Sequence, residues 1–294
     1  MKNYLSFLLL LFFSSLHSQT IKIINEVTHE PIPFTSIKFY RQGKVVNGDY
    51  ADQNGELTIT TVFDSFELTC LGYKNKTIEK DEIKKEIALE PISFLLKEII
   101  INKNNDLVEI GHANEKKGGI SGVERFYQAS VYIQNPYKIP VLIHSFLFNA
   151  LKVKGRRTYR IHLYKKSDKG EYPGIDLLPA DIVRVIEKGS KGQIEIDLSE
   201  YGIEMPAEGL YAAIEGLGGY DSKGNSILET NKSGFSFEAF QTYEYIYFIR
   251  PFFFQGKGWI NVNEFLINDG VVDRSNKKNF LAPSFGLRVI KPSK

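Results

Sequence analysis

Short segments in which apolar and polar residues alternate recur along this chain, separated by turns rich in glycine, proline and asparagine. Glu56–Thr61, Thr158–Tyr164 and Gln193–Leu198 are clear examples. Alternation with a period of two places every second side chain on the same face, as in a β-strand. The 21 phenylalanines and 16 tyrosines strengthen this interpretation, because aromatic residues favour strands. The sequence therefore predicts an all-β protein without a long helix.

The chain has one cysteine and little net charge. Cys70 cannot form an intramolecular disulfide, so each domain must be held together by its hydrophobic core. Cys70 alternates with Phe66 and Leu68, which predicts a buried, unreactive thiol on one face of a strand. The formal charge of +2 comes from interspersed acidic and basic residues, with no basic face. Nucleic acid is therefore not an expected partner.

The first eighteen residues have the pattern of a secretory signal peptide. Lys2 precedes an apolar run from Leu5 to Leu16, and cleavage after Ser18 would leave Gln19 as the new N-terminus. The run is shorter than the roughly 20 residues that a membrane-spanning helix needs. The residue directly after the cleavage site is Gln19, not the cysteine that a lipid anchor needs. We therefore expect an exported mature chain without a transmembrane segment, in the periplasm, at the outer membrane or secreted.

Residues 19–102 are expected to form the first domain. Its predicted strands are Ile21–Ile24, Phe34–Tyr40, Glu56–Thr61, Phe66–Leu71, Lys76–Glu79, Glu86–Leu89 and Leu95–Ile101. The short connections between these strands suit a compact antiparallel sandwich.

Several phrases in this domain occur in a characteristic order: Glu30-Pro31-Ile32-Pro33-Phe34, Ala51–Leu57, Leu71-Gly72-Tyr73-Lys74, Leu89-Glu90-Pro91 and Leu96–Ile101. With them, the segment resembles the carboxypeptidase-regulatory-like domain of Bacteroidetes envelope proteins. The resemblance implies a seven-stranded prealbumin-like β-sandwich that serves as an accessory module and carries no catalytic residues. The family usually has glycine in the first strand and threonine before the turn aspartate, where this chain has Ile23-Ile24-Asn25 and Ala51-Asp52.

Asp52-Gln53-Asn54-Gly55 is predicted to be a turn. Aspartate can accept hydrogen bonds from the backbone ahead, and glycine tolerates a positive φ. The neighbouring acids resemble a calcium loop, but Tyr50 occupies a position where that loop needs an acidic residue. We therefore expect a hairpin turn here.

His112 and Glu115 have the H-x-x-E spacing that zinc carboxypeptidases use. Such a site needs a third, distant ligand and a rigid scaffold, but His144 and His162 lie too near for that spacing. Residues 103–122 are polar and rich in glycine, which predicts a linker. We therefore expect no metal at this motif.

Other catalytic patterns are weak. His144 and Ser145 are adjacent, so on a regular strand they would point to opposite faces and could not pair. Glu195 and Asp197 share a face, as two glycosidase carboxylates would. Ile196 between them points to the other face, and this pattern is typical of a half-exposed strand whose acids are solvated. The sequence thus predicts no catalytic, cofactor-binding or metal-binding residue.

Residues 123–294 are expected to form a jelly-roll-like β-sandwich. The predicted strands are Val123–Ile133, Pro140–Val153, Thr158–Tyr164, Ile182–Glu187, Gln193–Leu198, Leu210–Glu215, Phe235–Phe240, Tyr243–Arg250, Trp259–Val262 and Gly286–Ile290. Alternation in the third of these predicts that His162 faces outward, as a surface histidine. Residues 173–211 are similar, more loosely, to the C-terminal sandwich of exported proteins with the same first domain.

Aromatic side chains form the candidate surface for a ligand or partner: Tyr243, Tyr245, Tyr247, Phe252, Phe253, Phe254 and Trp259. Three consecutive phenylalanines cannot all face one core, so part of that run is either covered by a loop or exposed. Aromatic clusters are mostly core, and both interpretations remain open.

We expect a non-catalytic, exported accessory protein of the cell envelope that acts through contacts with a protein partner. The alternative is a carbohydrate-binding protein that uses the aromatic residues of the C-terminal sandwich. A third hypothesis is a hydrolase with zinc at His112 and Glu115. No cofactor is expected for the accessory protein or for the carbohydrate-binding protein.

Overall fold

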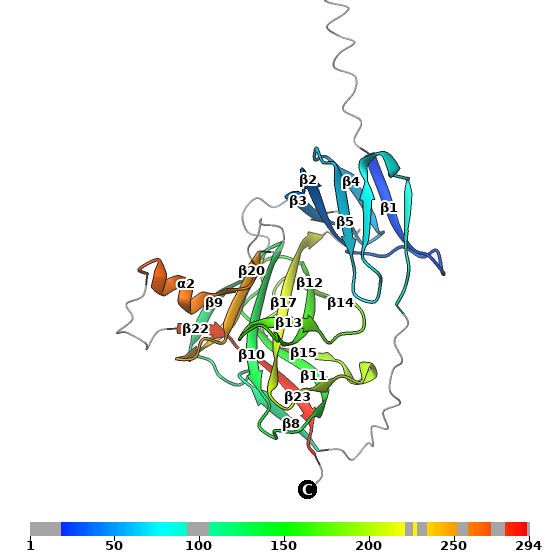
Figure 1. Ribbon diagram of the computed structural model, residues 1–294. Coiled ribbons are helices and arrows are strands. Elements are labelled where there is room, and N and C mark those ends of the chain that lie inside the picture. Colours follow the sequence, from blue (N-terminus) through cyan, green and yellow to red (C-terminus); the bar gives the residue numbers. More distant parts are fainter. Residues whose placement is uncertain are drawn as a thin grey trace, which may run out of the picture. The chain divides into compact units, whose positions relative to one another are not determined.

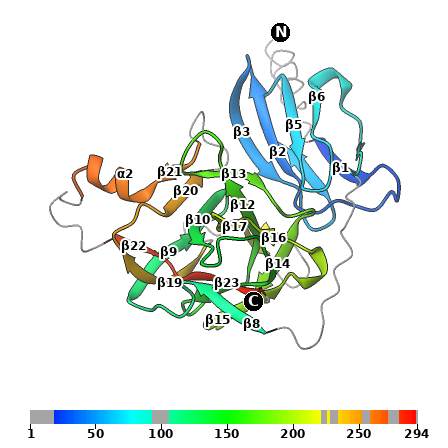
Figure 2. The same cartoon turned by 60° about the horizontal axis from the view of Figure 1, so that its bottom comes forward.

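The computed structural model describes residues 19–92, 106–220, 226–227, 234–251, 258–271 and 280–292 (Figures 1 and 2). These residues form β-strands almost throughout, as the alternation predicted. Contacts divide the chain into a first unit, Met1–Thr69 with Tyr73–Pro91, and a second unit, Cys70–Gly72 with Ile92–Lys294. In the described part of the chain, no helix is both long and apolar enough to span a bilayer.

The described strands of the first unit form two sheets. A three-stranded sheet has the order β4-β1-β7 and a four-stranded sheet the order β3-β2-β5-β6. The bounds are β1 Gln19–Asn25, β2 Ser36–Arg41, β3 Lys44–Tyr50, β4 Glu56–Ile59, β5 Ser65–Thr69, β6 Lys76–Glu79 and β7 Glu86–Leu89. β1 runs antiparallel to β4 and parallel to β7. Alternate residues of these strands, such as Ile21, Ile23, Phe66 and Leu68, are fully buried.

The turn predicted at Asp52 is confirmed. The Asp52 carboxylate accepts hydrogen bonds from the backbone N–H groups of Asn54 and Glu56, both at 2.8 Å. Gly55 has φ of +72°, and a Cβ atom there would lie 2.7 Å from the carbonyl oxygen of Ile23. Only glycine suits both the backbone conformation and this close approach. Asp52 therefore serves the turn.

One strand of the first unit escaped prediction. β3 pairs with β2, yet its sequence has two adjacent valines followed by Asn47 and Gly48 and shows little alternation. Among the described strands it lies at the end of its sheet and pairs with β2 alone, so that pairing decides its conformation more than burial does. The predicted strand Leu95–Ile101 lies outside the described residues.

The described strands of the second unit form two eight-stranded sheets. The first, called the β12 sheet, has the order β13-β12-β17-β10-β20-β21, with β14 also beside β12 and β18 beside β17. Its strands are β10 Tyr127–Gln134, β12 Arg157–Lys166, β13 Pro173–Asp176, β14 Ile182–Ile186, β17 Gly209–Tyr220, β18 Ser226–Ile227, β20 Tyr247–Pro251 and β21 Ile260–Asn261.

The second sheet, called the β11 sheet, has the order β22-β19-β11-β23-β8. β15 and β16 also pair with β11, and β9 pairs with β19. Its strands are β8 Leu107–Gly111, β9 Gly118–Val123, β11 Val141–Ala150, β15 Gly192–Asp197, β16 Glu204–Met205, β19 Phe235–Thr242, β22 Phe280–Pro283 and β23 Phe285–Ile290. In the described part of the chain, the one α-helix, α2, spans Val262–Asn268, and two 3-10 helices span Lys80–Glu82 and Ser199–Tyr201.

The core of the second unit takes side chains from both sheets. Phe148 of β11 lies among the rings of Phe146, Tyr159, Phe235, Phe237 and Phe285, with ring centroids 5.5–6.5 Å from its own. Most of these pairs meet edge to face, the arrangement that aromatic quadrupoles favour. These rings account for part of the high phenylalanine content.

The linker expected at residues 103–122 is a strand-bearing part of the second unit from residue 107 onward. β8 pairs with β23 and β9 with β19. The glycines that suggested flexibility permit close packing instead, since a Cβ atom on Gly122 would lie 1.4 Å from the carbonyl oxygen of Phe235. The pairing partners lie more than a hundred residues away, so local composition could not indicate them.

Most strands predicted for the second unit are confirmed with shifts at their ends. They are Pro140–Val153, Thr158–Tyr164, Ile182–Glu187, Gln193–Leu198, Leu210–Glu215, Phe235–Phe240 and Gly286–Ile290. Three predictions are wrong in part. The predicted strand Val123–Ile133 is interrupted at residues 124–126, between the end of β9 and the start of β10. Residues 243–246 form a turn ahead of β20, and Val262 begins α2 rather than ending a strand. The Asn261 side chain accepts hydrogen bonds from the N–H groups of Asn263 and Glu264, which starts the helix.

Candidate functional site

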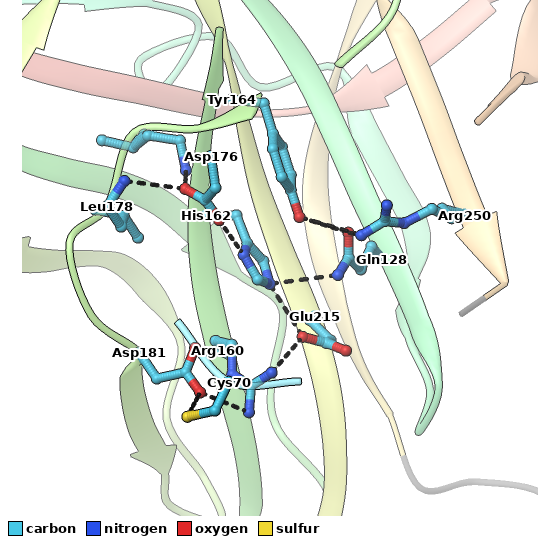
Figure 3. Close-up of polar contacts among 11 residues, drawn as sticks. Cys70, Gln128, Arg160, His162, Tyr164, Asp176, Leu178, Asp181, Glu215 and Arg250 are labelled. Carbon is cyan, nitrogen blue, oxygen red and sulfur yellow. Dashed lines mark hydrogen bonds and ion pairs between the residues drawn. The ribbon is translucent and has the colours of Figure 1, made fainter. Parts of the chain in front are cut away.

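The β12 sheet carries buried polar residues on the face opposite the core. On β12, core side chains alternate with Arg160, His162 and Tyr164, which point to this opposite face. The predicted alternation is therefore confirmed. The expectation that His162 is a surface histidine is wrong, because its side chain is buried. Asp176 of β13 contacts His162, and Asp181, just ahead of β14, contacts Arg160 (Figure 3).

These residues belong to a group that we call the polar cluster. Its members come from β10, β12, β13, β17, β20 and the residue before β14: Gln128, Arg160, His162, Tyr164, Asp176, Asp181, Glu215 and Arg250 (Figure 3).

His162 lies between two carboxylates. Its Nδ1 lies 2.6 Å from Asp176 Oδ2, and its Nε2 lies 3.0 Å from Glu215 Oε2 and 3.3 Å from Gln128 Nε2 (Figure 3). Burial alone would lower the pKa of His162, but the hydrogen bonds and charges of Asp176 and Glu215 outweigh burial and raise that pKa above its usual value. The ring therefore favours the doubly protonated, cationic form in this position.

Arg160 connects the same glutamate to a third carboxylate. Its guanidinium lies 3.3 Å from Glu215 Oε2 and 3.1 Å from Asp181 Oδ2. Burial raises the pKa of Asp181, and the charge of Arg160 opposes that rise. Glu215 is thus shared by a histidine and an arginine, both buried.

The other end of the polar cluster is built around Gln128. Its Oε1 accepts hydrogen bonds from the Tyr164 hydroxyl and from Arg250 Nη2, both at 3.0 Å. The Arg250 guanidinium also lies 4.7 Å from the centre of the Trp259 ring, a cation–π contact. The edge of that indole meets the Tyr164 ring, with centroids 5.5 Å apart. Burial raises the pKa of Tyr164 strongly, so its hydroxyl acts as a donor here.

The polar cluster is an electrostatically coupled unit whose carboxylates already contact cationic side chains or backbone N–H groups. Asp176 accepts additional hydrogen bonds from the N–H groups of Leu163 and Leu178. Such a network orients the strands that carry it, and its histidine can take up or release a proton. Sequence analysis did not identify it. The available signal was Glu215, a charge inside the apolar run Leu210–Leu217.

The H-x-x-E motif lies in the turn between β8 and β9. His112 Nδ1 and Glu115 Oε1 are 2.7 Å apart, and the imidazole stacks on the Phe240 ring with centroids 3.8 Å apart. The two side chains therefore contact each other, and the ring packs against the β11 sheet.

The expectation that His144 and Ser145 point to opposite faces is wrong. β11 has a register shift against β23 between Ile143 and Ser145, which places the two side chains near each other. His144 Nδ1 lies 3.5 Å from Ser145 Oγ, but that hydroxyl donates to Glu195 Oε1 at 2.5 Å. Ser145 is fully buried, while Glu195 and Asp197 are exposed on β15 as predicted.

The predicted aromatic surface separates into different environments. Tyr243 and Tyr245 lie on the turn between β19 and β20 with 59% and 46% of their surface exposed, whereas Tyr247 is buried in the core. Trp259 is half-buried against Arg250 and Tyr164. Phe252, Phe253 and Phe254 lie outside the described residues.

Helix α2 adds apolar side chains near the exposed tyrosines. Phe265 is 47% exposed, and Val271, just after the helix, is 68% exposed. The turn and the helix are joined, because Asn261 Nδ2 donates to the Tyr245 carbonyl at 2.8 Å and Asn263 Nδ2 donates to the Glu244 carbonyl at 2.9 Å. We call Tyr243, Tyr245, Phe265 and Val271 the apolar surface group. Sequence analysis found its tyrosines but missed the helix.

No protein-family model and no curated protein matches this chain. Among solved structures, it is similar to the cysteine protease and lectin-like domains of Cwp84, a surface layer associated protein of Clostridium difficile, at 6% identity and a TM-score of 0.38. It is also similar to that clostridial cysteine protease after propeptide cleavage, at 7% identity and the same TM-score. Both alignments cover 94% of this chain and, respectively, 63% and 71% of the other. With this TM-score and identity, the similarity does not indicate the fold or the function of this chain.

Proposed function

We propose that this chain is a non-catalytic binding protein of the cell envelope that contacts a protein partner through the apolar surface group. The observation that carries the proposal is the exposure of four large apolar side chains on two segments tied together by Asn261 and Asn263. Tyrosine and phenylalanine held on an ordered surface are typical of residues that anchor protein interfaces.

The proposal includes export. The sequence pattern of residues 1–18, a basic start followed by an apolar run and small residues, supports it. We expect protein purified from the cells that make it to lack residues 1–18. Intact-mass spectrometry with N-terminal peptide mapping checks this outcome. A mature chain that retains Met1 would contradict export by this route.

We further propose that the first unit is a prealbumin-like accessory module and the second a jelly-roll-like sandwich. The three-stranded and four-stranded sheets, with parallel β1 and β7, support the first assignment. The two eight-stranded sheets around one core support the second. In this arrangement both units are scaffolds, and the interaction depends on side chains at their surfaces.

Site-specific photo-crosslinking tests the partner contact. We expect a photoreactive phenylalanine analogue at Phe265 or Tyr243 to capture one discrete protein in intact cells. The same analogue at Val185, which is 42% exposed on β14 of the same unit, serves as the matched control and should capture none. Equal adducts at all three positions, or none at Phe265 and Tyr243, would rule out the apolar surface group as the contact.

A second candidate function, carbohydrate binding, is favoured by one observation. Trp259 is held half-exposed with Arg250 against its ring, and an oriented indole is a surface on which a sugar ring can stack. Trp259 is the only tryptophan in the chain, so its fluorescence reports on this position alone. Saturable quenching by one polysaccharide of a panel would support this candidate. Calorimetry should then detect binding of that polysaccharide to the parent protein and none to Trp259→Phe.

A further inference from the structure

The polar cluster fastens one segment of the chain to the outer face of the β12 sheet. The segment is 176–181, which runs from the end of β13 to the start of β14. Asp176 contacts His162 at its beginning, and Asp181 contacts Arg160 at its end. Leu177 N–H also donates to the Leu163 carbonyl at 2.7 Å. Two side chains of β12 therefore hold both ends of the segment (Figure 3).

Negative charge exceeds positive charge at this contact, and the excess grows when His162 is neutral. Asp176, Asp181 and Glu215 supply three carboxylates, while Arg160 and protonated His162 supply two cations at contact distance. Loss of the imidazolium proton leaves Arg160 alone against these acids in a buried region, where unbalanced charge is costly. Deprotonation also removes one of the two N–H donors of His162, so either Asp176 or Glu215 loses its hydrogen bond.

The remaining ionisable groups near the contact do not replace that charge. Arg250 of β20 faces Gln128 and Tyr164, and its contacts are to their oxygens and to aromatic rings. Tyr164 stacks on the His162 ring with centroids 5.2 Å apart. Cys70, which belongs to the second unit by its contacts, donates its thiol to Asp181 Oδ2 at 3.2 Å.

We propose that His162 is a pH-sensitive latch, which holds segment 176–181 closed when protonated and releases it when the imidazole loses its proton. The direction follows from linkage. Because the pKa of His162 is raised in the closed state, its stabilisation is complete below the ordinary pKa of 6.5 and is lost as the pH rises through the raised value. The raised pKa of Asp181 acts in the same direction, since its charged form is disfavoured by burial.

Hydrogen–deuterium exchange of the full chain tests the latch. After correction for intrinsic exchange, protection of the 176–181 amides should fall about tenfold per pH unit above 6.5 until the raised pKa is reached. In His162→Gln these amides should be poorly protected at every pH. The matched control His144→Gln removes a half-buried histidine of the same unit outside the polar cluster and should behave like the parent protein.

Two further measurements keep the test decisive if His162→Gln does not fold. Asp176→Asn should lower protection of the segment at pH 6 and flatten its pH dependence. NMR titration of the parent protein should give an imidazole pKa for His162 above 6.5. Protection that is independent of pH, an imidazole pKa at or below 6.5, or the same loss of protection in His144→Gln would each overturn the latch.

Discussion

Replacement of Phe148 by alanine is expected to lower the free energy of unfolding of the second unit by about 3–5 kcal/mol. The Phe148 ring is fully buried among five other aromatic rings from both sheets. Its removal loses apolar burial and leaves a cavity that rings fixed on opposing strands cannot close. Urea denaturation followed by the fluorescence of Trp259, the only tryptophan, measures this unit specifically.

Phe265→Ala is the matched control for this substitution. Phe265 is 47% exposed on α2, so the same chemical change removes little buried surface. We expect a change within about 0.5 kcal/mol, which is usual for surface positions. Similar losses of stability in both variants would contradict the position of Phe148 at the centre of the core.

Replacement of Glu215 by glutamine is expected to destabilise the second unit by about 3–5 kcal/mol at pH 7, because it leaves buried cations without their shared partner. Glu215 is fully buried, and its Oε2 contacts both His162 and Arg160. An amide keeps the size of the side chain but supplies no charge. The same denaturation experiment, repeated by circular dichroism, measures the loss.

Glu195→Gln tests the role of burial in this effect. Glu195 also contacts an arginine, Arg288, at 2.6 Å, but both side chains are about one-third exposed. Solvent screens this pair, so we expect a loss below about 1 kcal/mol. If Glu195→Gln lowered stability as much as Glu215→Gln, burial would not be the reason that the Glu215 contacts matter.

Strand prediction succeeded where each strand has one face in a core. Thr158–Tyr164 illustrates this, since its alternation correctly assigned Tyr159, Ile161 and Leu163 to the interior. It failed where pairing rather than burial decides conformation. β3 lacks alternation, and β8 and β9 find their partners β23 and β19 far along the chain. Local patterns carry no information about such distant partners.

The candidate sites were predictable only in part. Tyr243 and Tyr245 were identified from the sequence as a possible contact surface, and their exposure agrees with that role. Tyr247, from the same list, is buried because it begins β20 and packs in the core, whereas Tyr243 and Tyr245 lie in the turn before that strand. The pairing of His144 with Ser145 depends on a bulge in β11, which adjacent residues alone do not reveal.

By itself, the sequence determined the all-β class, the turn at Asp52, most strands with a buried face and the outward direction of His162, because each depends on a local period or a local turn. Tertiary structure alone decided that this outward face is covered. Asp176, Asp181 and Glu215 come from three separate segments and meet His162 and Arg160 only after the sheet has formed. Burial then strengthens their electrostatic interactions and converts a histidine that looked solvated into the centre of a charged network.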